Sequence, residues 1–128
     1  MYLVDGYPKI ESMVQMTMDV SEDLAKRLQP IRLWLPTVLE LSMIGFKTPA
    51  TQTASEITAF LLSNPTAQEV LDYHASERSQ KKLQQLLTLH QAGLLGQDEQ
   101  IELDELEKIE HILIVLKTQL AVEIQKQK

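Results

Sequence analysis

Residues 106–120 read LEKIEHILIVLKTQL, and this stretch has the most regular spacing of apolar residues in the chain. Its main apolar positions follow at intervals of three, four, three and four: Leu106, Ile109, Leu113, Leu116 and Leu120. Such intervals place side chains on one face of an α-helix. The pattern predicts one long amphipathic helix from about Asp98 to Gln125, and its 3-4 spacing suits packing along another helix, so we expect these five residues to bind a partner.

Acidic residues crowd the first half of this predicted helix. The cluster comprises Asp98, Glu99, Glu102, Asp104, Glu105, Glu107 and Glu110. It lacks the residue order of a calcium-binding loop, and helical spacing spreads its carboxylates around the axis. We interpret it as a solvated helix start that suits the helix dipole. The functional alternative is an acidic face that docks a basic protein, such as the cleft of an RNA-binding toxin.

Three further helical segments are predicted between residues 53 and 96. The motif Thr-x-x-Glu occurs at residues 53–56 and again at 66–69. In this motif the hydroxyl and the carboxylate each accept a hydrogen bond from a free N–H group at a helix start. Ser76 is the expected N-cap of the third segment. Residues 93–96, GLLG, are expected to form the turn that precedes the long helix.

The N-terminal third begins with an alternating stretch, MVQMTMDV, at residues 13–20. Alternation with a period of two predicts a short β-strand with one buried face. That apolar face consists of Val14, Met16, Met18 and Val20. Ser21 is suited to cap a first helix, which Pro30 should end. Pro36 is suited to the first turn of a second helix that continues to about Gly45.

The composition favours one small helical domain. Hydrophobic residues make up 44% of the 128 residues but aromatic residues only 5%, so an aliphatic core is expected. We expect a lead-in at residues 1–12, a strand-and-helix segment at 13–49 and a helical unit at 50–128. The chain has no cysteine and no apolar run of about 20 residues, which is typical of a cytoplasmic protein without a membrane span.

The order strand, cap, helix, turn, helix over residues 13–46 resembles the ribbon-helix-helix family. In that family two chains pair their strands into an antiparallel ribbon that lies in the major groove of DNA. The resemblance implies a homodimer that contacts operator DNA through Gln15, Thr17 and Asp19. It also implies a phosphate contact from the helix start near Thr37. The alternative is an extended stretch that packs on the helices of its own chain.

The charge is uneven along the sequence. The formal net charge is −6, and residues 1–49 account for only −1 of it, with five basic against six acidic side chains. Residues 50–128 account for −5, with seven basic against twelve acidic side chains. Because phosphate contacts supply most non-specific affinity for DNA, any DNA contact is expected from the first half, in an oligomer.

No catalytic or metal-binding motif emerges from the sequence. Each of the histidines, His74, His90 and His111, lacks the Glu-x-x-His spacing of a di-metal bundle. The serines at positions 21, 55 and 76 are explained as helix caps, so no Ser-His-Asp arrangement is implied. We therefore expect no cofactor, no metal and no enzymatic activity.

Two functions are consistent with these patterns. The first is an antitoxin-like DNA-binding dimer that represses its own operon and binds a toxin, such as a nuclease, through its C-terminal helices. The second is a helical adaptor or oligomerisation module that does not bind DNA and whose long helix pairs with another helix.

Overall fold

The computed structural model of the chain describes residues 3–4, 7–8 and 13–126. Its elements in chain order are β1 (Leu3–Val4), β2 (Tyr7–Pro8), α1 (Glu22–Leu28), the 3₁₀ turn η1 (Gln29–Ile31), α2 (Leu35–Ser42), α3 (Thr51–Leu62), α4 (Ala67–Leu71), α5 (Glu77–Gln91) and α6 (Gln97–Lys126). The two short strands pair with each other in antiparallel orientation. The expected mainly α class is confirmed.

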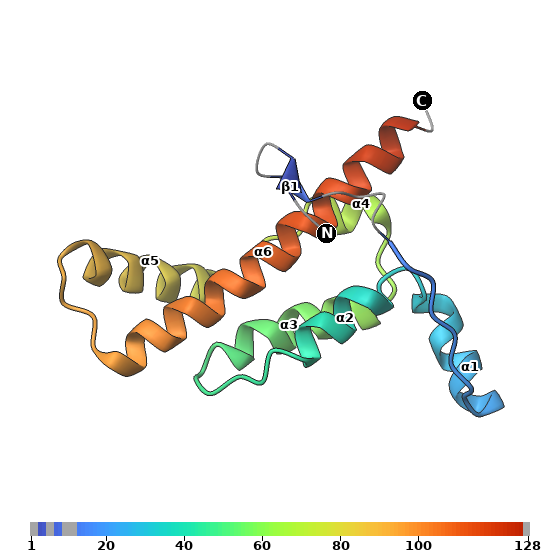
Figure 1. Cartoon of the computed structure of the whole chain (residues 1–128), viewed down its shortest axis with the longest axis horizontal. Coiled ribbons are helices and arrows are strands. Elements are labelled where there is room, and N and C mark those ends of the chain that lie inside the picture. The colour runs from blue at the N-terminus through green and yellow to red at the C-terminus, as the bar shows by residue number, and fades with distance from the viewer. Residues whose placement is uncertain (1–2, 5–6, 9–12, 127–128) are drawn as a thin grey trace.

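Helix α6 is the longest helix of the described chain and runs diagonally across the view in Figure 1. The expected long helix from about Asp98 to Gln125 is confirmed, because α6 spans Gln97–Lys126. Helices α2, α3, α4 and α5 all pack against it. Charged residues recur along α6, and no helix within residues 13–126 combines the length and apolarity needed to cross a bilayer.

One hydrophobic core joins the helices on both sides of the loop at residues 43–50. Its most deeply buried large side chains are Trp34, Leu41, Ile57, Leu61, Val70, Leu86 and Leu103. Trp34 is only 2% exposed, and its indole Nε1–H donates a hydrogen bond of 3.2 Å to the carbonyl oxygen of Pro65. Because a buried indole N–H needs an acceptor, this bond ties the start of α2 to the turn between α3 and α4.

Three expected helix starts are confirmed. The Ser21 hydroxyl accepts the backbone N–H of Leu24 at 3.1 Å, and the Ser76 hydroxyl caps α5 in the same way. Thr66 and Glu69 form a complete capping box at α4. The hydrogen bond from the Thr66 backbone N–H, with a further contribution from its side chain, lowers the pKa of Glu69 below its ordinary value.

The expected capping box at residues 53–56 and the expected cap at Ser55 are wrong, because these residues lie inside α3. Helix α3 begins at Thr51, and its first free N–H groups donate instead to the backbone carbonyls of residues 48–50. The Thr48 hydroxyl also accepts the N–H of Ala50 at 3.1 Å. The hydroxyl of Thr53 lies within the helix and shares a hydrogen bond of 2.8 Å with Ser79 on α5.

The predicted strand at residues 13–20, and with it the ribbon-helix-helix-like fold, is wrong. Residues 13–20 have no regular secondary structure, and all eight side chains are exposed. A strand requires a neighbouring chain segment to pair its backbone N–H and C=O groups. Among the described residues no segment lies beside residues 13–20 to pair with them, so neither the predicted buried face nor packing on the chain's own helices is present.

Candidate protein-binding surfaces

An exposed apolar arm occupies residues 13–20. Its large apolar side chains are mostly open to solvent, with exposed fractions of 87% for Met16, 86% for Val14 and 61% for Met18. Five of the eleven large exposed hydrophobic side chains of the described chain lie in these eight residues. A concentration of exposed apolar side chains of this kind is typical of interaction sites in proteins.

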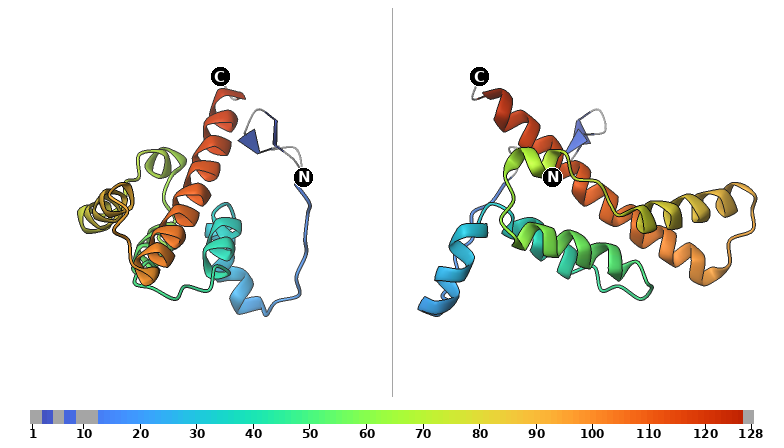
Figure 2. Two further views of the ribbon diagram at one scale, coloured as in Figure 1. Left: turned by 60° about the vertical axis from the view of Figure 1, so that its left-hand side comes forward. Right: turned by 180° about the vertical axis from the view of Figure 1, so that it is seen from behind.

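Helix α1 continues this arm without joining the core. None of its residues is buried, and its main contacts are with the adjoining turn η1. The right-hand view of Figure 2 shows α1 standing away from the bundle. A seven-residue helix is too short to be stable in water without packing. Leu24 and Leu28 of α1 are only half-buried, so contact with a further surface would stabilise this helix. We refer to residues 13–28, the arm together with α1, as the N-terminal segment.

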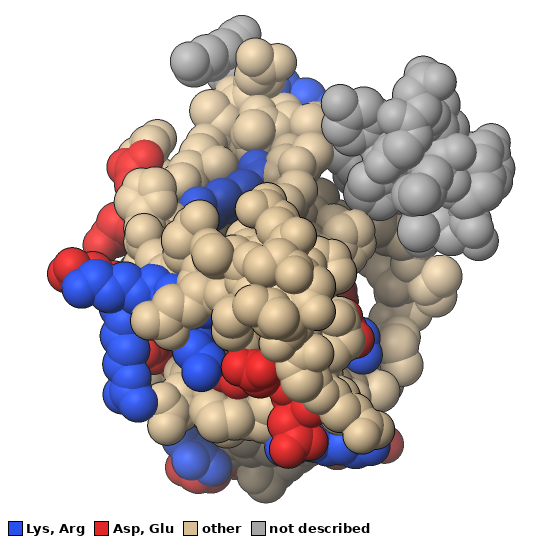
Figure 3. Space-filling view, turned by 90° about the vertical axis from the view of Figure 1, so that its left-hand side faces the viewer, with Lys and Arg blue, Asp and Glu red and all other residues tan. Residues whose placement is uncertain are grey.

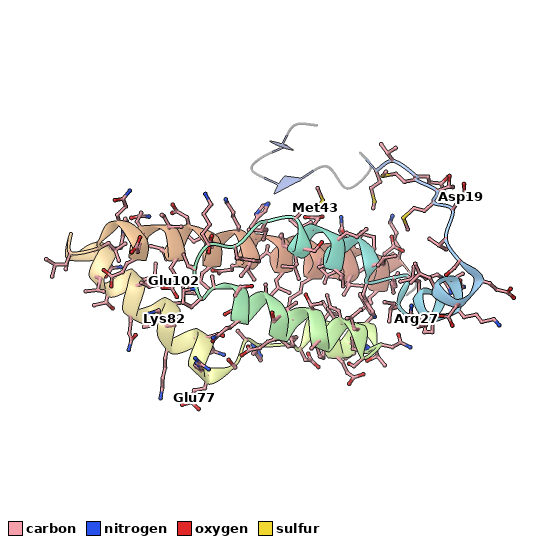
Figure 4. All side chains as sticks on the ribbon, turned by 90° about the horizontal axis from the view of Figure 1, so that it is seen from below. Asp19, Arg27, Met43, Glu77, Lys82 and Glu102 are labelled. Carbon is pink, nitrogen blue, oxygen red and sulfur yellow. The ribbon has the colours of Figure 1, made fainter. Side chains whose placement is uncertain are left out.

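The residues expected to contact DNA do not form one surface. Gln15, Thr17 and Asp19 are exposed on the irregular arm, and Figure 4 shows Asp19 at the edge of the molecule. Thr37 lies in the first turn of α2 and is buried, on a different element from the other three residues. The space-filling face in Figure 3 shows both basic and acidic side chains, with acidic groups beside the basic ones.

The apolar side chains along one face of α6 pack against other helices of the same chain. Leu106, Ile109, Leu116 and Leu120 are buried in the hydrophobic core, and Leu113 packs against that core while half-buried. These residues lie at the centre of the bundle because α2, α3, α4 and α5 cover the same face of α6. The helix partner predicted from the 3-4 spacing is therefore supplied by the other helices of the same chain.

Two residues of the acidic cluster, Glu102 and Glu105, are buried and form an ion pair or hydrogen bonds with other parts of the chain. The Glu105 carboxylate accepts the backbone N–H of Lys47 at 2.8 Å and the hydroxyl of Thr48 at 2.5 Å. The Glu102 carboxylate lies 3.7 Å from the Lys82 ammonium, and Figure 4 shows the two side chains meeting between α6 and α5. Their interpretation as solvated residues was wrong, because their partners lie 20 to 58 positions away in the sequence, beyond the reach of helical spacing.

A polar pocket of about 700 Å³ lies between α3, α5 and α6. Glu56 on α3 accepts hydrogen bonds from the hydroxyls of Ser76 at 3.2 Å and Ser79 at 3.4 Å. Thr53 extends this network through its bond to Ser79. Every buried polar side-chain atom of the described chain has a hydrogen-bond partner, so these groups stabilise the packing of α3 against α5.

Tyr73 links α4 to its neighbours. Its ring lies against Phe60 with the ring centres 4.5 Å apart, and its backbone carbonyl accepts a hydrogen bond of 2.6 Å from the Lys117 ammonium on α6. Burial raises the pKa of the Tyr73 hydroxyl, and the negative charge of Glu56 raises it further. The hydroxyl therefore stays protonated at neutral pH and acts here as part of the packing.

A second depression, of about 550 Å³, lies between α2 and α6. Its apolar lining is Met43, Ile44 and Ile112, and its polar lining is Glu40, Asp104, Glu107, Lys108 and His111. Met43 is 82% exposed, and Figure 4 shows it directed outward from the end of α2. Three carboxylates against one ammonium give this groove an acidic rim. We call it the α2–α6 groove.

The structure does not bring the histidines together. His74 follows α4, His90 lies near the end of α5 and His111 lies on α6. Within residues 13–126 no three histidine, aspartate or glutamate side chains converge in a way that could hold a metal ion.

Comparison with known proteins gives no match: no family model, no curated protein and no solved structure is significantly similar to this chain.

Proposed function

We propose that this chain is a non-catalytic helical adaptor or oligomerisation module that acts by holding another protein through its N-terminal segment. The observation that carries this proposal is the exposure of the apolar side chains at residues 13–20, next to a helix that has no buried residue. The rest of the chain already buries an aliphatic core around α6. Within the described chain, exposed apolar side chains are most concentrated in the N-terminal segment.

The energy available from covering this surface is substantial. Complete burial of one Met or Val side chain contributes roughly 1.5–3 kcal/mol. Met13, Val14, Met16, Met18 and Val20 are all exposed to solvent. Burying even half of this surface would offset a large part of the entropy lost when two proteins associate.

The proposed partner is a protein and not DNA. Residues 13–20 do not form the strand that would present Gln15, Thr17 and Asp19 to base edges. The net charge of −6 also disfavours contact with phosphates. Repression of an operon therefore does not form part of the proposed function.

The α2–α6 groove supports a second candidate, the docking of a basic protein such as a toxin. Its exposed Met43 supplies an apolar contact, while Glu40, Asp104 and Glu107 supply an acidic rim. Charge complementarity of this kind favours a partner rich in Lys and Arg and speeds its encounter. On this proposal the partner is held by the exposed edge of α6 and not by its buried leucine stripe.

Site-specific photo-crosslinking tests the main proposal. A benzophenone side chain is introduced at Met16 of the full chain and, in a matched variant, at Leu94, which is exposed on the α5–α6 loop. We expect a protein adduct at Met16 and none at Leu94 in native cells, detected by gel mobility and mass spectrometry. The absence of an adduct at Met16, or equal adducts at both positions, would refute the proposal.

A further inference from the structure

The N-terminal segment and its continuation to residue 32 differ in charge from the rest of the chain. Residues 13–32 contain three basic side chains, Lys26, Arg27 and Arg32, and three acidic ones, Asp19, Glu22 and Asp23, so their net charge is zero. The full net charge of −6 therefore resides in the remaining residues. Two copies of an acidic protein repel each other least where they are neutral and apolar, and this region has both properties.

The order of charges within α1 is complementary to itself. Glu22 and Asp23 occupy its first turn, and Lys26 and Arg27 occupy its last turn. If a second α1 lies antiparallel to the first, the acidic end of each helix faces the basic end of the other. A two-fold contact of this kind requires a surface that is complementary to its own copy.

Within one chain these four charges form only weak pairs. Lys26 lies 3.9 Å from Glu22, and Arg27 lies 3.4 Å from Asp23. All four side chains are more than two-thirds exposed, and ion pairs in such positions contribute little to stability. Figure 4 shows Arg27 on α1, at the end of that helix nearest the bundle. The charged groups are thus open to pairing with a second molecule.

The size of the region also suits a dimer. A specific interface involves about 20 to 30 residues on each side. Residues 13–33 provide 21 positions, near the lower end of that range, and include six of the eleven large exposed apolar side chains of the described chain.

We propose that the N-terminal segment binds a second copy of this chain, with the two α1 helices antiparallel and the two arms covering each other's apolar side chains. This inference rests on the proposed function and names its partner. A basic partner protein would instead be expected at the acidic remainder of the surface, because residues 13–32 carry no net charge and offer it no electrostatic attraction.

The mass of the full chain in solution is the first test. The chain has a mass of 14.6 kDa, and sedimentation equilibrium should give twice this value at micromolar concentration. A wild-type protein that remains a monomer throughout the micromolar range would overturn the inference.

Charge reversal then tests the antiparallel arrangement. The basic variant carries Glu22→Lys and Asp23→Lys, and the acidic variant carries Lys26→Glu and Arg27→Glu. For each variant alone, the dissociation constant of the dimer should rise by about tenfold or more, because like charges then face each other across the two-fold axis. A mixture of the basic and acidic variants should form a heterodimer with affinity close to that of the wild-type dimer.

The restored heterodimer separates electrostatic pairing from damage to the fold. A variant that simply fails to fold would not recover on mixing, and circular dichroism monitors the helix content of each variant. The matched control is Glu77→Lys on α5, where Glu77 forms a similar exposed pair with Lys81 at 3.4 Å. This control should leave the dimer affinity unchanged, and an equal loss in the control would overturn the inference.

The outcomes also distinguish this inference from the proposed function. A monomeric wild-type protein that still crosslinks through Met16 to a different protein would refute the second copy and leave the adaptor function intact. A monomeric protein without any crosslink at Met16 would refute both. A dimer that is unaffected in both charge variants would place the interface outside α1 and refute the inference.

Discussion

The N-terminal segment and the bundle that follows it are built from similar residues but have opposite environments. Both regions contain helices with well-formed caps, at Ser21 in one and at Thr66 and Ser76 in the other. The helices of the bundle bury their apolar side chains against α6, whereas α1 buries none. Apolar patterning therefore defines which surface must be covered, but it does not identify the molecule that covers it.

The largest expected difference between the two regions is in the effect of removing an apolar side chain. Trp34→Ala should lower the free energy of unfolding by about 3–5 kcal/mol, because it empties a buried site and removes the hydrogen bond to Pro65. Met18→Ala, in the exposed arm, should change the stability of the monomer by less than about 0.5 kcal/mol. Urea titration at a concentration where the chain is monomeric measures both values.

If Trp34→Ala does not fold, Trp34→Phe can take its place in the comparison of unfolding free energies with Met18→Ala. The phenylalanine retains most of the ring volume but leaves the Pro65 carbonyl without its donor, and we expect a loss of about 1–3 kcal/mol. Similar losses for Met18→Ala and the Trp34 variants would mean that the arm is packed within the monomer.

A smaller difference is expected between two carboxylates on α6. Glu105→Ala should cost about 1–3 kcal/mol, because the Lys47 N–H and the Thr48 hydroxyl lose their buried acceptor. Glu107→Ala, two residues further along and exposed, is the matched control and should cost less than about 0.5 kcal/mol. Hydrogen exchange at the Lys47 amide should accelerate only in the Glu105 variant. Equal behaviour of the two variants would contradict the buried role of Glu105.

The smallest expected difference is between the helix caps of the two regions. Thr66→Ala should lower the stability of the bundle by about 1 kcal/mol, because α4 contributes the buried Val70 to the core. Ser21→Ala should reduce helix content locally but leave the unfolding midpoint of the monomer unchanged, because α1 buries no residue. Chemical denaturation of both variants, with circular dichroism as the probe, checks this prediction. A shifted midpoint in Ser21→Ala would show that α1 is coupled to the bundle.

The capping box of α4 also predicts a dependence on pH. The folded pKa of Glu69 lies below its ordinary value of 4.5, so its ionised form stabilises the folded state. This contribution is present above pH 4.5 and is lost as the pH falls through the folded pKa. Glu69→Gln keeps a hydrogen-bond acceptor but cannot ionise. The difference in stability between the wild type and Glu69→Gln should therefore disappear in acid, and a difference that is constant with pH would contradict the assignment.

Local patterns predicted much of the helical structure. The 3-4 spacing from Leu106 to Leu120 indicated α6, and Ser21, Thr66 and Ser76 indicated the starts of three other helices. These predictions succeeded because helical periodicity and capping depend on residues within a few positions of each other. The expected cap at Thr53 failed because α3 begins two residues earlier, at Thr51, where the backbone carbonyls of residues 48–50 accept its first N–H groups.

The candidate surface was located by its pattern but misinterpreted. Alternation at residues 13–20 correctly marks a stretch with an apolar side to cover, yet the same alternation predicted a strand that is not formed. Strand formation depends on a pairing partner outside the stretch, and no local property of the stretch reveals whether one exists. Glu102 and Glu105 of the acidic cluster were misinterpreted for a related reason, because their partners lie on α5 and in the loop before α3. The cluster's Asp98, Asp104, Glu107 and Glu110 are exposed, as expected.

By itself, the sequence determined the mainly helical class, the length of α6 and the position of an apolar stretch before the first helix. Only the tertiary structure decided which apolar faces find partners within the chain. The leucine stripe of α6 is covered by four other helices, and residues 13–20 remain exposed. The physical reason is that apolar periodicity indicates which side chains would gain free energy from burial. Burial itself requires a complementary surface, which either the fold or another molecule must bring into contact.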